Sequence, residues 1–304
     1  MRRLFLPAFL LCAVSASAGN NRSAVSVGGL DTNSCTPASP CRSFVAAIAA
    51  TNPGGEIVAL DSAGYGPFSI PIPVTVSGAP GVHAAITATS GDAIQVAAGA
   101  ADRVSIRNLV LIGAGAPRGI YHLNGAALDV VHCLIRGYPT GILVESDGAV
   151  DVTIDDTTLL DCQGGINMYG DYSGVNAIHA TITNSLIQGG SQGLTANYST
   201  KVLVSHCTIA SNITGASSIA NTGGPALTAD LTIEDSVIAH NIHGTVVSAV
   251  APAIAKLTLS ANVIAYCASE GVYQIDAVAY TFGNNVFASN LSDSPIAMTP
   301  VSLK

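Results

Sequence analysis

Hydrophobic and polar positions along the chain alternate with a period of two in many short segments, such as "AVDVTIDDT" and "DLTIEDS". This alternation predicts β-strands whose alternate side chains point inward. The strands recur in a larger pattern of ~25 residues, in which a small polar residue, a hydrophobic pair, a polar loop and a glycine follow one another. No repeat has room for a crossover helix. The pattern therefore predicts a parallel β-helix, in which each strand stacks on its equivalent in the next repeat.

The repeats align on the last residue of the hydrophobic pair and on the glycine that closes the loop. The aligned hydrophobic residues are Ile135, Leu160, Ile187, Ile209, Ile238, Ile264 and Phe287. The loop-closing glycines are Gly119, Gly141, Gly165, Gly193, Gly215, Gly244 and Gly271. The alignment predicts which residues share a column along the axis of the coil.

Two repeats contain a His-Cys pair, His132-Cys133 and His206-Cys207, which raises the question of a metal site. Both cysteines lie two positions before the aligned hydrophobic residue, in a column that otherwise holds Thr158, Ser185, Ser236, Asn262 and Asn285. Three repeats separate the cysteines, or ~14 Å at the spacing of stacked strands, which is too far for a shared metal ion or a disulfide. We therefore expect buried free thiols in a column of small polar residues, and free thiols also at Cys162 and Cys267.

A short helix is predicted ahead of the first repeats, where it would cover the open end of the coil. In "TPASPCRSFVAAIAATNPGG", Ser39 is expected to cap this helix and Pro40 to be its first residue. Its apolar face would consist of Phe44, Val45 and Ile48, and Pro53-Gly54-Gly55 would end it. Cys35 and Cys41 lie just before it and are predicted to form a disulfide, with free surface thiols as the alternative.

The first residues have the features of a secretory signal. Arg2 and Arg3 precede the apolar run "LFLPAFLLCAVSA", and Ala16-Ser17-Ala18 supplies small residues for cleavage after Ala18. We therefore expect a secreted or periplasmic protein that consists of a signal peptide (1–18), an N-terminal segment with the disulfide loop and helix (19–55) and the β-helix repeats (56–304). No later segment contains the ~18 apolar residues of a membrane span.

The composition suits this interpretation. Of the 304 residues, 49% are hydrophobic and only 10% are charged, and the formal net charge is −8. After Arg136 the only basic residues are Lys201, Lys256 and Lys304, so nucleic acid is excluded as a partner on electrostatic grounds. A monomer is expected.

The helix in "PCRSFVAAIAAT", the segment "GEIVALDSAGYGPFSI" and repeat units such as "VTIDDTTLLDCQGGI" together resemble the right-handed parallel β-helix superfamily of pectin-lyase-like proteins. That superfamily includes polysaccharide lyases, glycoside hydrolases, uronate epimerases and non-enzymatic surface proteins, so the resemblance implies a fold without selecting a reaction. The sequence signatures of its polygalacturonate hydrolases occur only in fragments: Asp155-Asp156 precedes the polar turn, and no Arg-Ile-Lys follows His243-Gly244. The second half also has almost no basic residue for the proton abstraction that the lyases perform.

In enzymes of this fold, ligands lie along the strand that follows the loop-closing glycine. Alternation along these strands is expected to expose a set of polar and aromatic side chains. Aromatic faces and amides suit sugar rings. The candidate ligand-binding residues are therefore Tyr121, Asn167, Tyr169, Asn197 and Tyr273.

Three acidic residues, Glu145, Asp147 and Asp171, follow in the same register and are candidate catalytic residues. Asp147 and Asp171 are predicted to lie on adjacent coils about 5 Å apart. From Glu145 to Asp171, both included, there are seven acidic residues and no Lys or Arg, so Asp147 and Asp171 are a candidate calcium site. A carboxylate pair at this separation also suits a retaining glycosidase. A solvated acidic face is the alternative.

The sequence thus predicts an exported β-helix protein that binds a polysaccharide or a cell-surface glycan. Two alternatives remain open. One is a polysaccharide lyase or glycoside hydrolase with atypical motifs, and the other is a purely structural solenoid.

Overall fold

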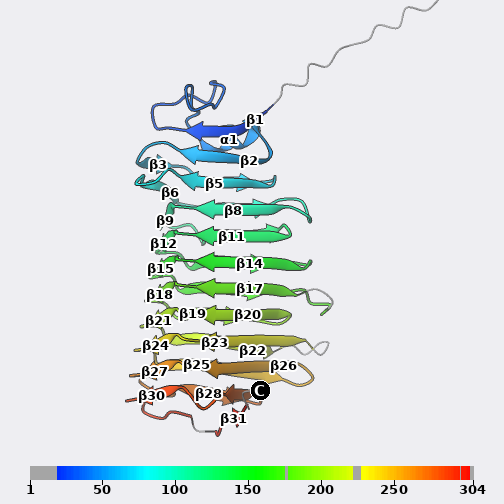
Figure 1. Cartoon of the computed structure of the whole chain (residues 1–304), viewed down its shortest axis with the longest axis vertical. Helices are drawn as coiled ribbons and strands as arrows, with labels where there is room; N and C mark the ends of the chain where they lie inside the picture. The colour runs from blue at the N-terminus through cyan, green and yellow to red at the C-terminus, as the bar shows by residue number, and fades with distance from the viewer. Residues whose placement is uncertain (1–18, 175–176, 222–226, 295, 302–304) are drawn as a thin grey trace, which may run out of the picture.

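The computed structural model describes residues 19–174, 177–221, 227–294 and 296–301. They form an elongated column of stacked coils, with the N-terminus at one end and the C-terminus at the other (Figure 1). Three sheets run along the column, and their strands pair in parallel from coil to coil. The predicted all-β parallel β-helix is confirmed. The predicted signal peptide lies outside the described residues, and the division of the rest at residue 55 stays a prediction.

The strands of each sheet follow one another at regular intervals along the sequence. Sheet 1 contains β1 (Asn20–Val25), β2 (Thr51–Ala59), β5 (Val74–Gly78), β8 (Arg103–Arg107), β11 (Ala127–Val131), β14 (Val150–Asp155), β17 (Ile178–Thr183), β20 (Thr200–Ser205), β23 (Thr228–Glu234), β26 (Ile254–Ser260), β29 (Val278–Thr281) and β31 (Thr299–Pro300). Sheet 2 contains β4 (Phe68–Ile70), β7 (Asp92–Ala97), β10 (Arg118–Asn124), β13 (Thr140–Glu145), β16 (Gly164–Tyr169), β19 (Gln192–Ala196), β22 (Thr214–Asn221), β25 (His243–Val250) and β28 (Val272–Ile275). Sheet 3 contains β3 (Ala63–Tyr65), β6 (Ala84–Ala88), β9 (Leu109–Gly113), β12 (Leu134–Arg136), β15 (Thr158–Leu160), β18 (Leu186–Gln188), β21 (Thr208–Ala210), β24 (Val237–Ala239), β27 (Val263–Ala265) and β30 (Val286–Ala288).

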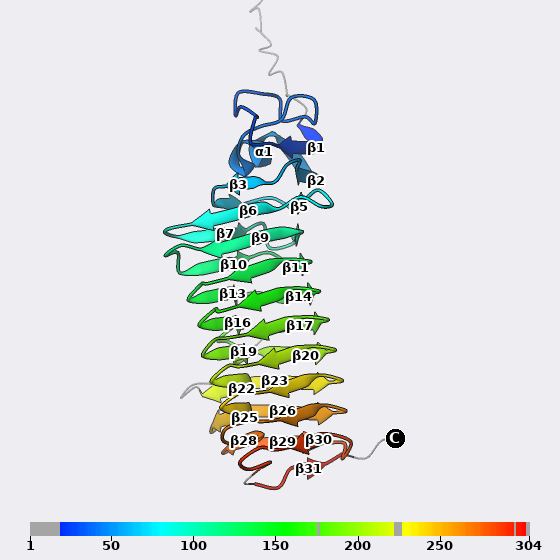
Figure 2. The ribbon, with the colours of Figure 1, turned by 90° about the vertical axis from the view of Figure 1, so that its left-hand side faces the viewer.

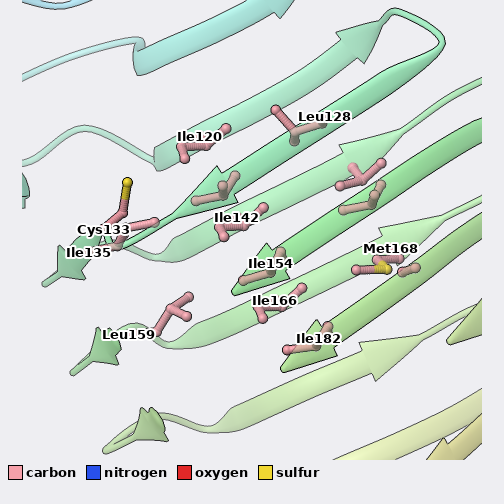
Figure 3. Close-up of a cluster of buried hydrophobic side chains, with 14 of the residues drawn as sticks. Ile120, Leu128, Cys133, Ile135, Ile142, Ile154, Leu159, Ile166, Met168 and Ile182 are labelled. Atoms are coloured by element: carbon pink, nitrogen blue, oxygen red, sulfur yellow. The ribbon is translucent and has the colours of Figure 1, made fainter. Parts of the chain in front are cut away.

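Each coil passes from sheet 1 through a tight turn to sheet 3, then through a second turn to sheet 2 and back to sheet 1 (Figure 2). The interior of the coil is filled by the inward side chains, which stack in columns. Figure 3 shows Ile120, Ile142 and Ile166 in one such column on sheet 2, in the register that their strand pairing gives. All three side chains are fully buried. Stacking of like apolar residues supplies the main stabilisation of the coil.

The aligned hydrophobic residues form another inward column on sheet 3, with one correction. Leu159, and not the predicted Leu160, pairs with Ile135 and Ile187. The reason is the turn before the strand, where one residue in each coil from Asn108 to Ala261 adopts a left-handed backbone, as at Asp156 with φ of 46°. The inward residue comes three positions after this residue, which makes Leu159 the buried member and leaves Leu160 half-buried.

The two His-Cys pairs belong to this turn. His132 and His206 are the left-handed residues, with φ of 54° and 55°. Cys133 and Cys207 are buried free thiols. They belong to the predicted column of small polar residues, in which Thr157 takes the place of the predicted Thr158 because of the same one-residue shift. The backbone N–H of Cys133 donates to Thr157 Oγ1, and the N–H of Cys207 donates to Ser236 Oγ. The ladder continues through Ser185, Asn262 and Asn285.

The predicted N-terminal helix is present as α1 (Phe44–Ala50), but it begins later than expected. Ser43, and not Ser39, is its N-cap and accepts a hydrogen bond from the backbone N–H of Ala46. The carboxylate of Asp31 accepts hydrogen bonds from the backbone of Arg42 and Ser43, which holds these residues extended. Phe44, Ala47 and Ile48 have the spacing i, i+3, i+4 of one helix face and are buried, whereas Val45, which was predicted on that face, points outward.

The predicted disulfide between Cys35 and Cys41 is confirmed, and both residues are buried. Cys162 and Cys267 are free thiols, as predicted, and both are buried. Among the described residues, no helix is both long and apolar enough to cross a membrane.

Candidate functional site

The outward face of sheet 2 carries the candidate ligand-binding residues. Strand pairing aligns one outward residue per coil, from Tyr121 on β10 to Tyr273 on β28. Between these two tyrosines the column contains Leu143, Asn167, Thr195, Ser217 and Val246. Thr195 and Ser217, in the middle of this face, are almost completely buried, and their hydroxyl groups are hydrogen-bonded to each other.

A pocket opens where the ends of β13 and β16 pass into the loops that lead to sheet 1. We call it the Glu145 pocket. Its volume is about 270 Å³, near the lower limit for small-ligand pockets of ~300 Å³. Its lining residues are Leu123, Glu145, Ser146, Asp147, Tyr169, Gly170, Tyr172 and Tyr198.

Three tyrosines form one side of the Glu145 pocket. The ring of Tyr198 lies edge-on to that of Tyr172, with 4.6 Å between centroids, and 6.0 Å from that of Tyr169. Tyr172 is 56% exposed, which leaves its ring open to a ligand. Burial raises the pKa of Tyr198, and the nearby Tyr172, Tyr169 and Glu145 add to this effect, so its hydroxyl keeps its proton at neutral pH.

Glu145 is held from the neighbouring coil. The hydroxyl of Tyr121 donates a hydrogen bond to Glu145 Oε2 at 2.8 Å. Burial and this bond to the carboxylate raise the pKa of Tyr121, so the hydroxyl stays a donor. The Arg118 guanidinium stacks over the Tyr121 ring, 4.0 Å from its centroid, and its Nε bonds Asp92 at 2.5 Å. Tyr121 therefore positions Glu145 and is not itself a lining residue.

The acidic candidates separate into two environments. Asp147 lies in the exposed loop after β13 and lines the Glu145 pocket with Glu145. Asp171 follows β16 and is not among the lining residues. Its carboxylate accepts hydrogen bonds from the backbone N–H of Ser173, at 2.7 Å, and from the Ser173 hydroxyl, so it stabilises its own loop. In the described part of the chain, no group of three or more His, Cys, Asp or Glu residues could hold a metal ion. Calcium binding stays a prediction.

The five candidate ligand-binding residues do not converge on one site. Tyr169 lines the Glu145 pocket, and Tyr121 supports it. Asn167 lines a separate polar hollow of about 340 Å³ with Thr140, Gly164 and Gln192. Asn197 is buried at 8% exposure, and its Nδ2 lacks a hydrogen-bond partner among the described residues. Tyr273 lies at the far end of the column.

The sequence alignment missed Tyr172 and Tyr198 because both lie in loops beyond the ends of the strands. A signal was present, since three of the nine tyrosines, Tyr169, Tyr172 and Tyr198, occur within 30 residues of one another. Which loops meet in space depends on their lengths and conformations, and the repeat pattern does not specify these.

A larger hollow of about 570 Å³ lies on the outward face of sheet 1. It is lined by charged residues of both signs, among them Asp151, His179, Lys201 and Asp230. His179 Nδ1 and Asp151 Oδ1 are 3.9 Å apart, and both side chains are more than half exposed, so this pair contributes little energy. No Phe, Tyr or Trp is among its described lining residues, and we do not assign a ligand to it.

The fold and this face define a parallel β-helix protein with a polar and aromatic surface along one sheet. Residues 118–287, more than half of the chain, match the family model described as "Right handed beta helix region". The chain belongs to this family, which also confirms the predicted hand of the coil. A search of curated protein sequences found no significant match.

Solved structures with the same fold include several polysaccharide-active proteins. An alginate lyase from Paenibacillus sp. str. FPU-7 is 16% identical with a TM-score of 0.67, and the match covers 90% of this chain and 98% of that one. The pectate lyase Pel9A is 15% identical with a TM-score of 0.58, covering 94% and 79% of the two chains. A GH136 lacto-N-biosidase from Eubacterium ramulus is 10% identical with a TM-score of 0.52, covering 93% and 68%. At these identities the likeness establishes the fold alone.

Proposed function

We propose that this protein binds a polysaccharide at the Glu145 pocket and hydrolyses a glycosidic bond there. The observation that carries the proposal is the presence of two carboxylates, Glu145 and Asp147, in one pocket with three tyrosines. Proteins that act on pectate, alginate and a lacto-N-bioside substrate share the fold, which supports a carbohydrate as the ligand. Export of the protein, predicted from residues 1–18, would give it access to such a substrate.

Binding is assigned to the tyrosines. A sugar ring has a weakly apolar face and a rim of hydroxyls, and a tyrosine offers a matching apolar ring and a polar tip. Tyr169, Tyr172 and Tyr198 present rings at different angles within one pocket. Tyr172 and Asp147 are both exposed, so a polymer in solution can reach the pocket.

Hydrolysis is assigned to the two carboxylates. Glu145, which the hydrogen bond from Tyr121 holds in place, is assigned to activate a water molecule or to attack the anomeric carbon. Asp147 supplies the second carboxyl group, which protonates the oxygen of the leaving sugar. The anomeric C–O bond breaks, the oxygen of water joins the anomeric carbon, and the two protons of water end on the two new hydroxyl groups.

The charge of the pocket favours a neutral polysaccharide over a polyuronate. Two acidic side chains line it, and no basic side chain is among the lining residues. Arg118, which stacks on Tyr121 beside the pocket, is already paired with Asp92. A uronate carboxylate would therefore meet a like charge without compensation. The same lack of a Lys, Arg or His among the lining residues disfavours elimination, for which the pectin-lyase-like lyases use a basic residue.

Substitution of the carboxylates is expected to separate cleavage from binding. Glu145→Gln and Asp147→Asn should each lower the release of reducing ends from a neutral polysaccharide by about 100-fold or more, because each removes a proton-transfer or attacking group. Both variants should still bind the polymer on a glycan array. Glu234→Gln, a carboxylate at the end of β23, is the matched control and should leave activity unchanged. Binding by the wild type without any release of reducing ends would reduce the proposal to glycan binding alone.

Substitution of a tyrosine is expected to affect binding itself. Tyr172→Ala should weaken glycan binding by about 1 kcal/mol, the value of one aromatic contact. Tyr266→Ala is a matched control, since Tyr172 and Tyr266 are 56% and 57% exposed and Tyr266 follows sheet 3 instead of sheet 2. Isothermal titration with the array's strongest ligand measures both. Equal losses in the two variants would contradict the assignment of the Glu145 pocket, and binding of no glycan by the wild type would favour a structural solenoid.

A further inference from the structure

A second cluster of polar and aromatic side chains lies on the same face of sheet 2, near the C-terminal end of the coil. His243 Nδ1 and Glu270 Oε2 are hydrogen-bonded at 2.7 Å. The imidazole ring of His243 also stacks on Tyr273, with centroids 5.6 Å apart and an angle of 24° between the planes. The side chains of His243 and Glu270 are 30% and 22% exposed, so the pair is partly sheltered and still accessible.

The cluster occupies defined positions in the coil. His243 and Glu270 are the residues directly before the loop-closing glycines Gly244 and Gly271, and Tyr273 follows Glu270 by three positions. Hydrogen bonds to Ser269 and His243 lower the pKa of Glu270, which keeps it ionised at neutral pH. The ionised Glu270 fixes the orientation of the His243 ring through Nδ1, which leaves Nε2 on the opposite side of the ring from this hydrogen bond.

The same construction stands at the other end of the face, beside the Glu145 pocket. There the ion pair is Arg118 with Asp92, and the cation stacks on Tyr121, three positions after Arg118. At each end of the face, a planar side chain is paired with a carboxylate and stacks on a tyrosine ring. Arg118 does so at one end and His243 at the other. Between the two ends, Leu143, Thr195 and Ser217 of this column are buried, and Asn167 and Val246 are half-buried. None of these five side chains is therefore fully exposed on the path from one end to the other.

We propose that His243, Glu270 and Tyr273 form a distal binding subsite for the polysaccharide that occupies the Glu145 pocket. The proposal rests on the proposed function, because the occupant is the same polymer. Five strand steps separate β13 from β28, or about 24 Å at ~4.8 Å per step, so only an extended chain reaches both places. The Tyr273 ring provides a stacking surface for a sugar, and His243 provides a hydrogen-bonding group for a hydroxyl of the same ring.

The distal subsite predicts that the protein discriminates by chain length. The probes are mixed-linkage β-glucan, glucomannan, galactomannan and xyloglucan, each embedded in native gels for affinity electrophoresis, and a trisaccharide fragment of each for calorimetry. For the polymer that retards the wild type, Tyr273→Ala and His243→Ala should each weaken binding about 5-fold, because one ring contact is lost. Neither should change the affinity for the trisaccharide, which is too short to span the two places. Tyr273→Phe keeps the ring and should bind the polymer as the wild type does.

The outcomes distinguish the subsite from the proposed function. If Tyr172→Ala weakens polymer binding and Tyr273→Ala does not, the distal subsite is refuted and the Glu145 pocket remains supported. If Tyr273→Ala weakens polymer and trisaccharide equally, the cluster is no distal subsite. If no polymer retards the wild type, both proposals fail together. Thermal melting of each variant checks that a loss of binding is not a loss of fold, and His243→Ala carries the test where Tyr273→Ala proves unstable.

Discussion

Replacement of His122 by leucine is expected to make the protein more stable, and by a margin that grows as the pH falls. His122 lies on β10 and points into the coil between Val96 and Val144 of the adjacent coils. It is fully buried, and neither ring nitrogen has a hydrogen-bond partner among the described residues. A leucine of similar size removes this uncompensated polar group, so a gain of ~1 kcal/mol is expected even at pH 7.

The pH dependence follows from the pKa of the imidazole. Burial lowers the pKa of His122 from 6.5 to about 4, because the charged form is poorly solvated inside the coil. Between these values the unfolded chain binds a proton that the folded chain does not bind, so the stability of the wild type falls as the pH falls from 6.5 to 4. The full loss is about 3 kcal/mol, since one pKa unit corresponds to ~1.4 kcal/mol.

Urea unfolding at pH 7, 5.5 and 4 measures this effect. The difference in unfolding free energy between His122→Leu and the wild type should widen by about 3 kcal/mol across this range. His83→Gln is the control, because His83 is an exposed histidine of the same coil region, and its difference from the wild type should stay constant. A constant difference for His122→Leu as well would show that the imidazole can be protonated without leaving the core.

Replacement of Gly193 by alanine is expected to disrupt the coil. A Cβ at Gly193 would lie 2.4 Å from the carbonyl oxygen of Gly215 in the next coil and 2.9 Å from Cγ2 of Ile209. The first contact is with backbone, which cannot move without breaking the stacking of β19 on β22. We therefore expect a destabilisation of ~3 kcal/mol or more, visible as a much lower melting temperature and a lower soluble yield.

Gly64 provides the matched control for this substitution. It lies on β3, and no heavy atom lies within 4 Å of the position that its Cβ would take. Gly64→Ala should change the stability by no more than ~0.5 kcal/mol. Equal melting temperatures for Gly193→Ala and Gly64→Ala would falsify the close approach between adjacent loop-closing glycines.

The repeat alone determined the architecture of this protein. The inward column on sheet 3 from Ile135 to Phe287 and the loop-closing glycines could be aligned from the sequence, because every coil faces the same packing constraints. The same alignment identified the His-Cys pairs as turn residues, since a column of Ser, Thr, Asn and Cys indicates side chains that bond the backbone of the next coil. The disulfide followed from the closeness of Cys35 and Cys41 in sequence.

Where two neighbouring residues fit the sequence pattern equally well, only the tertiary structure shows which of them takes the role. Either Leu159 or Leu160 satisfies a hydrophobic pattern, and only the left-handed backbone at Asp156 decides which one points inward. In the same way, Ser39 and Ser43 are both acceptable helix caps, and Asp31 decides between them by bonding the backbone before Phe44. Such decisions depend on a contact from a distant residue, which a local pattern does not contain.

The sequence determined one part of the candidate site, and the tertiary structure determined the rest. Alternation along the strands following the glycines placed Tyr121, Glu145 and Tyr169 on one face from the sequence alone, because a strand has a strict period of two. The Glu145 pocket itself also requires Tyr172 and Tyr198, which come from loops whose paths obey no repeat. Asp171, by contrast, does not line the pocket, because its carboxylate accepts a hydrogen bond from Ser173 within its own loop. The repeat specifies the strands because they stack on copies of themselves, whereas the loops meet only through the packing of the whole coil.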